Sequence, residues 1–275
     1  MNDKGQIIIT EILFYILLSV IILSVIIYAT ETINDYQVTG INNRQLNKLL
    51  EDNLLTLTKT SGKPENWEKI NTNKIETIGL KQTKTDMLDY DKIMRLKDSP
   101  QLLENHFPDG VSYVLMLYPK NNPNKREVIA QRGTFNNRKQ IRAKNRTVII
   151  DYKLKSTFLK NNESCPYEHD DKWSCITINV NENTLSNTKY YLLSDSNIEY
   201  ILSNTYSDNI TGQTQKTCIN SQIMQLIKND NQTIHVHTKS DTNNTYLVRD
   251  ANNRERFIES VIKPEIYVLK LIIAV

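Results

Sequence analysis

The chain opens with MNDKGQIIITEILFYILLSVIILSVIIYATET, residues 1–32, and this segment sets the expected architecture. Between Ile7 and Ala29 the only ionisable side chains are Glu11 and two tyrosines. A helix that rises about 1.5 Å per residue would extend this run over roughly 34 Å, more than the roughly 30 Å hydrocarbon core of a bilayer. The run therefore predicts a transmembrane helix over residues 6–29. The apolar segment of a cleaved secretory signal is shorter.

The flanks of the apolar run predict its orientation. Lys4 precedes the run, whereas Glu31 and Asp35 follow it and Arg44 is the next cation. Because basic residues are retained on the cytoplasmic side, this slight bias predicts a cytoplasmic N-terminus. The expected localisation is the cell membrane, with a single pass in contact with membrane lipid and an extracellular C-terminal domain.

The residues before the run carry a family resemblance. Lys4-Gly5-Gln6, followed by an apolar run with an early Glu11, resembles the class III signal peptide of archaeal type IV pilins and pilin-like proteins. The resemblance implies that a prepilin peptidase cuts between Gly5 and Gln6. It also implies that the apolar helix packs with other pilin-like subunits, where Glu11 offsets the freed amine of a neighbouring Gln6.

One feature departs from the family pattern. The family usually places Glu fifth in the mature chain, whereas Glu11 would be sixth after a cut before Gln6. Two interpretations follow: a filament helix with one extra Ile, or a plain anchor that mimics the motif.

A helical pattern continues beyond the apolar run, over residues 30–58. A leucine stripe with spacings of three and four predicts one buried helix face, although Gly40 interrupts the pattern. The stripe consists of Leu46, Leu49, Leu50, Leu54 and Leu57. Gly62-Lys63-Pro64 is a stop signal for this helix, and Trp67 is expected to cover its end. This turn is similar to the membrane-proximal part of many pilin-like secreted proteins of methanogenic archaea.

From Gly110 onward the pattern predicts strands. Val111–Tyr118 has the composition of a buried strand, and Ile266–Val275 that of a terminal core strand. Helices are expected to interrupt the sheet at Ser196–Asn204, Cys218–Asn229 and Asn252–Ile262.

The predicted fold class is α+β: a long N-terminal membrane-spanning helix, then a mostly antiparallel β-sheet head domain with a few short helices, as in pilin-like proteins. The expected segments are a leader (1–5), the transmembrane helix (6–29), its extension (30–58), a helical and turn-rich connection (59–109) and the extracellular head (110–275).

Composition limits the classes of function. The net charge of +3 is too small and too dispersed to favour a nucleic acid partner. The densest basic run, Arg132–Arg146, is interpreted as a solvated loop and strand edge, the alternative being a patch for an anionic surface polymer. With seven glycines and no recognisable phosphate loop or nucleophile motif, the sequence predicts no cofactor and no enzyme activity.

Cysteine and histidine spacing gives the remaining candidates. Cys165 and Cys175 bracket a loop whose spacing suits a disulfide outside the cell, and Cys218 is left over. The acidic residues of the same loop, with His169, form a mixed ligand set that does not predict a metal site. His235 and His237 would lie on one face of a strand, interpreted as solvated.

Three hypotheses follow for the function. The leading one is a pilin-like extracellular structural protein, a subunit or minor component of a type IV pilus-like filament. The second is a single-pass surface protein whose head binds a ligand or a cell-surface polymer without polymerising. The third is a tethered extracellular hydrolase, for which no catalytic residues are assigned.

Overall fold

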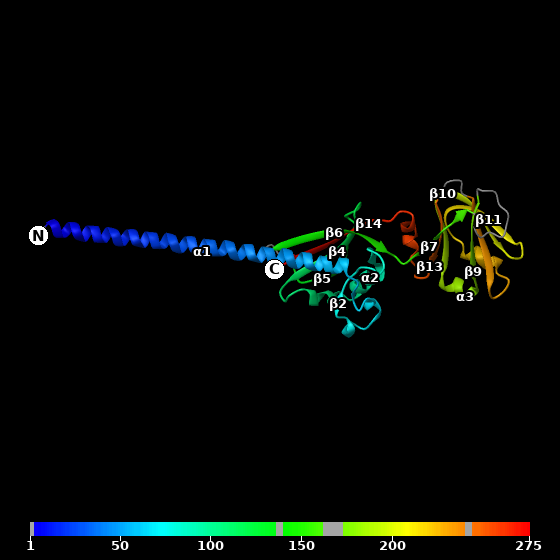
Figure 1. The fold of residues 1–275 in the computed structure, drawn as a ribbon, viewed down its shortest axis with the longest axis horizontal. Coiled ribbons are helices and arrows are strands. Elements are labelled where there is room, and N and C mark those ends of the chain that lie inside the picture. The colour runs from blue at the N-terminus through cyan, green and yellow to red at the C-terminus, as the bar shows by residue number, and fades with distance from the viewer. Residues whose placement is uncertain (1–2, 136–139, 162–172, 240–243) are drawn as a thin grey trace.

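The structure is a computed structural model that describes residues 3–135, 140–161, 173–239 and 244–275, with all their side chains except those of 3–13, 29–43 and 160–161. The molecule is elongated, and one long helix projects from two strand-rich units arranged along the longest axis (Figure 1). In the part of the chain that the structure describes, residues in strands outnumber those in α-helices.

The elements follow in chain order. The helices are α1 (Asp3–Lys59), α2 (Tyr90–Asp98), α3 (Glu182–Asn187) and α4 (Asn220–Leu226), with 3-10 turns η1 (Trp67–Lys69), η2 (Thr72–Lys74), η3 (Pro100–His106) and η4 (Glu255–Val261). The strands are β1 (Gly62–Lys63), β2 (Thr77–Ile78), β3 (Leu88–Asp89), β4 (Ser112–Pro119), β5 (Glu127–Arg132), β6 (Ile141–Asp151), β7 (Lys155–Phe158), β8 (Lys160–Asn161), β9 (Trp173–Val180), β10 (Lys189–Asn204), β11 (Asn209–Cys218), β12 (Gln232–Lys239), β13 (Thr245–Asp250) and β14 (Ile266–Ala274).

The long helix and its buried face are as the sequence predicts. α1 is continuous through Gly40, and within the leucine stripe Leu50, Leu54 and Leu57 are buried. The stripe packs against the sheet that contains β6 and β14. The spacing of the leucines therefore identified the buried face of the helix correctly.

The turn after α1 depends on a glycine. Gly62 has a φ of +82°, and a Cβ at this position would lie 2.5 Å from Cδ1 of Trp67. The Trp67 side chain is fully buried, and its Nε1 donates a hydrogen bond to the carbonyl of Gly79 over 2.9 Å. The aromatic ring therefore packs within the turn that follows the helix, while the amides of Leu80 and Lys81 donate to the carbonyls of Leu57 and Thr60 at the helix end.

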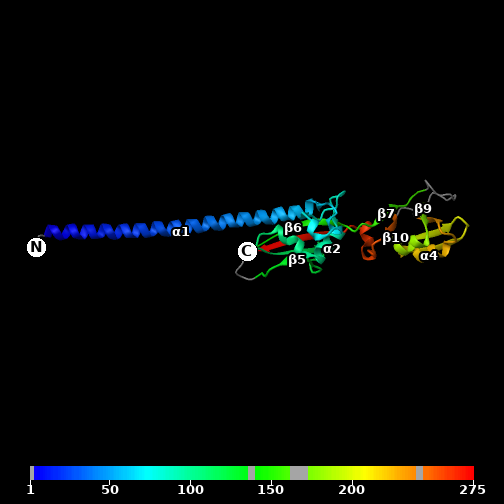
Figure 2. The same cartoon turned by 90° about the horizontal axis from the view of Figure 1, so that it is seen from below.

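The unit next to α1, here called the five-stranded unit, contains a sheet with the strand order β3-β6-β14-β4-β5. α1 lies along this sheet in contact with β6 and β14 (Figure 2). β14 is the central strand. Its Leu269, Leu271 and Ile273 are fully buried, in the same core as the leucine stripe of α1. The C-terminal strand thus completes the core that α1 covers.

The second unit, here called the seven-stranded unit, follows β6 and precedes β14 in the chain. Its sheet has the order β7-β13-β10-β12-β9-β8, with β11 also paired to β10. α3 and α4 cover one face around Leu202, Ile223 and Val236, while η4 packs on the other face beside Leu193. The unit is therefore an insertion between two neighbouring strands of the five-stranded sheet.

The predicted fold class was wrong. Within the part of the chain that the structure describes, no helix is long and apolar enough to cross a membrane. The strands form curled sheets in a mixed α/β fold in place of one antiparallel head sheet.

Some predictions for individual elements are confirmed, and one was wrong. The prediction of a terminal core strand is confirmed by β14, and α4 confirms the core of the helix expected at Cys218–Asn229. The helix expected at Ser196–Asn204 was wrong, because this segment is the second half of β10. Its buried residues Ile198, Tyr200 and Leu202 alternate, which is the period of a strand.

Candidate functional site

The first candidate is the apolar surface of α1 between Phe14 and Tyr28, here called the α1 apolar surface. Its large apolar side chains are each between 42% and 73% exposed, and they surround the helix on every side. Over this range α1 projects beyond both strand-rich units (Figure 1). A helix that is apolar all round normally lies inside a larger apolar structure, so this surface is suited to binding other apolar surfaces.

Two hydroxyls interrupt the α1 apolar surface without making it polar. Ser19 Oγ donates to the carbonyl of Tyr15 over 2.7 Å, and Ser24 Oγ donates to the carbonyl of Val20 over 2.8 Å. Both groups are satisfied within their own helix, so an apolar neighbour can cover them without leaving a donor unpaired. The small serines also leave a shallow groove lined by Ile16, Leu23 and Ile27, of the kind into which a neighbouring helix can pack.

The residues implied by the pilin resemblance lie at the start of α1. The backbone of Gly5, Gln6 and Glu11 is helical. Their side chains lie outside the described residues. The cleavage between Gly5 and Gln6 and the assembly role of Glu11 therefore stay predictions.

The predicted disulfide also stays a prediction, because Cys165 lies outside the described residues. Cys175 is buried on β9, with its Sγ 3.0 Å from Nδ1 of His237. The other ring nitrogen of His237, Nε2, lies 3.0 Å from the hydroxyl of Ser203 on β10. Three neighbouring strands therefore place a thiol, an imidazole and a hydroxyl in one buried row. These are the side-chain types that nucleophilic catalytic sites use.

His235 and His237 share a face of β12, as their spacing predicts. They are 7% and 2% exposed, so the interpretation as a solvated face was wrong. Nδ1 of His235 lies 3.0 Å from the hydroxyl of Thr177, and burial lowers the pKa of this imidazole. In the described part of the chain no three His, Cys, Asp or Glu side chains converge as a metal ligand set would.

A second polar cluster, here called the junction cluster, joins the two strand-rich units. It consists of Asp89, Asp91, Lys153 and Arg254. The Lys153 Nζ lies 2.8 Å from a carboxylate oxygen of Asp89 and 2.8 Å from one of Asp91. Arg254 follows β13, and its buried guanidinium donates to Asp91 and to the carbonyl of Tyr152.

Aromatic rings surround the junction cluster. Tyr152 and Phe257 stack with their ring centroids 3.9 Å apart, and Tyr90 packs at 5.2 Å from each of them. Burial opposes ionisation of Asp91, but the Lys153 hydrogen bond and the Arg254 charge together lower its pKa. The two chain segments that connect the units are therefore fixed by charge and by packing at one place.

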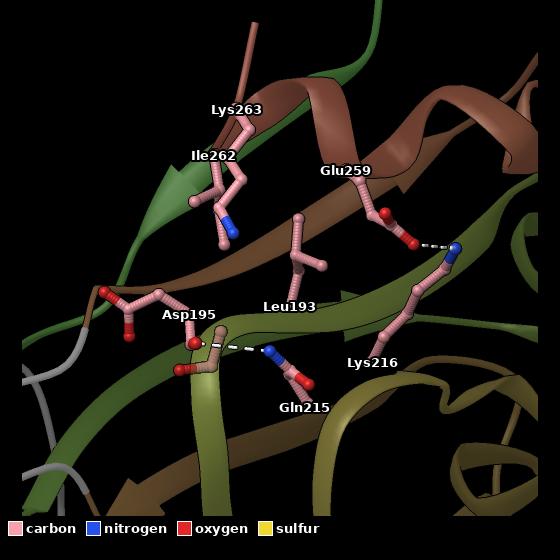
Figure 3. Close-up of a pocket in the computed structure, with 8 residues that line it drawn as sticks. Leu193, Asp195, Gln215, Lys216, Glu259, Ile262 and Lys263 are labelled. Atoms are coloured by element: carbon pink, nitrogen blue, oxygen red, sulfur yellow. Dashed lines mark hydrogen bonds and ion pairs between the residues drawn. The ribbon is translucent and has the colours of Figure 1, made fainter.

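A cavity of about 170 Å³ lies between β10, β11 and η4 (Figure 3). Lys216 and Glu259 meet at its rim in an ion pair of 2.9 Å, and Gln215 Nε2 donates to the backbone carbonyl of Asp195 over 3.2 Å. Most ligand pockets have volumes of about 300–1,000 Å³, so this cavity is small for a substrate site. Of its charged side chains, Lys216 and Glu259 already pair with each other.

The sequence did not predict the junction cluster, and its basic run Arg132–Arg146 covers only the first part of the strand β6. Asp91 and Arg254 are 163 positions apart, so no local pattern could relate them. For β6 a signal existed: Arg142, Lys144 and Arg146 alternate, as side chains on one face of a strand do. The run Arg132–Arg146 was interpreted as a solvated loop and strand edge: the strand is confirmed from Ile141 onward, and residues 136–139 of the expected loop lie outside the described residues.

Comparison of the chain with protein-family models, with curated proteins and with solved structures found no match in any of the three.

Proposed function

We propose that this chain is a structural subunit that assembles with copies of itself, or with similar chains, through the α1 apolar surface. The strand-rich units then face outward and α1 forms the interior of the assembly. The observation that carries the proposal is the exposure of apolar side chains around the whole circumference of α1 from Phe14 to Tyr28.

The energetics favour covering this surface. Burying one large apolar side chain is worth about 1.5–3 kcal/mol, and the α1 apolar surface offers 13 such side chains at 42% exposure or more. Among the described side chains, those of α1 that the five-stranded unit covers begin at Leu46 and follow the leucine stripe. Neighbouring helices that surround Phe14–Tyr28 would remove most of this area from water.

The resemblance to archaeal type IV pilin-like proteins supplies further parts of the proposal. A prepilin peptidase would cut between Gly5 and Gln6, and Glu11 would offset the new amine of a neighbouring subunit within the helix bundle. A carboxylate and an amine that pair in this way avoid the cost of burying either charge alone. The strand-rich units, from Gly62 onward, would lie outside the cell.

A pair of matched substitutions tests the assembly. Leu23→Glu places a carboxylate in the α1 apolar surface, at a position that is 61% exposed. Met224→Glu places the same group on α4, where the side chain is 42% exposed, and serves as the control. Sedimentation velocity and electron microscopy should show large assemblies for the parent chain and the Met224 variant, but separate chains for the Leu23 variant.

Two results would contradict the proposal. One is a Leu23→Glu protein that assembles as the parent does. The other is a parent chain that sediments as a monomer at every concentration.

Processing is tested separately. The chain is produced in cells that contain a prepilin peptidase, and the N-terminus is read by mass spectrometry. A start at Gln6 supports the cleavage, whereas Met1 at the start of every molecule argues against it. The assembly proposal is judged by the Leu23 result alone.

A further inference from the structure

β6 has one edge without a strand partner along most of its length. Its first edge pairs with β14 from Ile141 to Ile149. Along the second edge, the described residues pair with β6 only where β3 meets Ile150 and Asp151. Between Ala143 and Ile149 the described part of the chain therefore presents backbone N–H and C=O groups to which a further strand can bind.

A groove follows this open edge. Two hollows, of about 530 and 750 Å³, share Asn145 and Arg146 as lining residues and together extend from Ala143 to Ile149. α1 forms one wall of the groove, through Glu51 and Leu54 at one end and Thr58 and Lys59 at the other. The groove is thus as long as the open edge and bounded on one side by a helix.

The charge of the groove is predominantly positive. Lys144 Nζ lies 2.5 Å from a Glu51 carboxylate oxygen, so this pair is neutral. Asp86 also lines the groove; it pairs with Lys81 over 3.0 Å, and the nearby charge of Lys59 helps to lower its pKa. Arg146 has no carboxylate within ion-pair distance among the described residues, and Lys270 adds a further cation to the lining. Arg146 lines the same hollow as Glu51 and Lys144, and both cations contribute to lowering the pKa of Glu51, Lys144 the more strongly.

The positive charge selects against a second copy of β6. Antiparallel pairing of two β6 edges around Asn145 would bring Lys144 and Arg146 of each chain close to those of the other, and like charges on facing strands are destabilising. β5, at the other end of the same sheet, carries one carboxylate, Glu127, which already binds Lys97. The occupant must therefore be a different strand with carboxylates of its own.

We propose that the groove between α1 and β6 binds an extended acidic segment of a partner protein. The segment pairs as an added strand with Ala143–Ile149 and directs its carboxylates toward Arg146 and Lys59. Main-chain hydrogen bonds to the open edge supply affinity, and the two cations select acidic side chains. The site is separate from the α1 apolar surface, so the proposal holds whether or not the chain assembles.

The test uses the full chain and a fluorescein-labelled, amidated heptapeptide of alternating glutamate and threonine, with fluorescence anisotropy as the readout. Two further peptides carry N-methyl groups on either the glutamates or the threonines. Because alternate N–H groups of a strand point to the same neighbour, methylation of one set should abolish binding and methylation of the other should preserve it. Binding of both methylated peptides at parent affinity would exclude strand addition.

Charge substitutions test the location of the site. Arg146→Glu should weaken binding of the heptapeptide by at least about tenfold, because like charges then face each other. Lys125→Glu makes the same change in charge at an exposed position in the turn between β4 and β5 and should bind as the parent does. The proposal is overturned if the heptapeptide does not bind, or if the two variants have equal affinity.

Discussion

The two strand-rich units differ in how the chain builds them. The seven-stranded unit comes from one continuous segment, Lys155–Asp250, and has a core of its own under α3 and α4. The five-stranded unit needs α1, the strands before the insertion and β14 after it. Because closing a long loop costs entropy before its contacts form, the five-stranded unit depends on the seven-stranded unit for bringing β6 and β14 together. The strands of the seven-stranded unit follow one another along the chain, so this unit does not depend on the five-stranded unit in the same way.

The largest effect should come from cavities in the two cores. Leu271 and Leu202 are both fully buried, one in β14 and the other in β10. Either leucine-to-alanine substitution should lower the free energy of unfolding by about 2–5 kcal/mol, measured by chemical denaturation. Hydrogen exchange should then separate them: Leu202→Ala lowers protection in β10–β12, whereas Leu271→Ala lowers it in β4, β6 and β14. Equal loss across both units in the Leu202 variant would show that the units unfold as one.

A smaller effect is expected at the junction cluster. Arg254→Met removes a buried guanidinium and leaves the Tyr152 carbonyl without its donor, while Asp91 keeps Lys153. The expected loss is about 2–3 kcal/mol, below the roughly 3–5 kcal/mol for breaking a fully buried pair, since Asp91 is partly exposed. Arg126→Met, at an exposed position just before β5, should change stability by less than about 0.5 kcal/mol. If both variants unfold at the same denaturant concentration, Arg254 does not fix the units.

The smallest expected effect is the dependence of the junction cluster on pH. The pKa of Asp91 is lowered from the ordinary value of 3.8, so its ionised form stabilises the fold fully above that pH. This contribution is lost as the pH falls through the lowered value. The stability difference between the parent and Arg254→Met, measured in urea at pH 7 and at pH 3, should therefore narrow in acid. A difference that stays constant would mean that Asp91 does not carry the interaction.

Much of the region around α1 could be predicted because its signals are local. The leucine spacing is set by the period of the helix itself, and Gly62 and Trp67 act within a few residues of where α1 ends. Ser196–Asn204 shows where such signals fail. Ile198, Ile201 and Leu202 fit helical spacing, yet β10 lies in the middle of a sheet and pairs with β11, β12 and β13. Pairing on both sides outweighed local preference.

Of the candidate sites, only those carried by adjacent residues could be found without the fold. The apolar composition of Phe14–Tyr28 and the alternating cations of β6 are visible in the printed chain. The row of Cys175, His237 and Ser203 could not be found in this way, because it depends on the order of β9, β12 and β10 in the sheet. Strand order is fixed by long-range pairing, on which spacing along the chain gives no information.

The sequence by itself determined a long N-terminal helix, the face of that helix that is buried and the turn that ends it, since each follows from the period and the conformational limits of nearby residues. It also determined that an apolar surface would remain on α1. The tertiary structure alone decided that β14 returns between β4 and β6, that Arg254 meets Asp91, and that one edge of β6 stays open beside α1. These features depend on contacts between residues that are distant in the chain, and such contacts exist only once the sheets have formed.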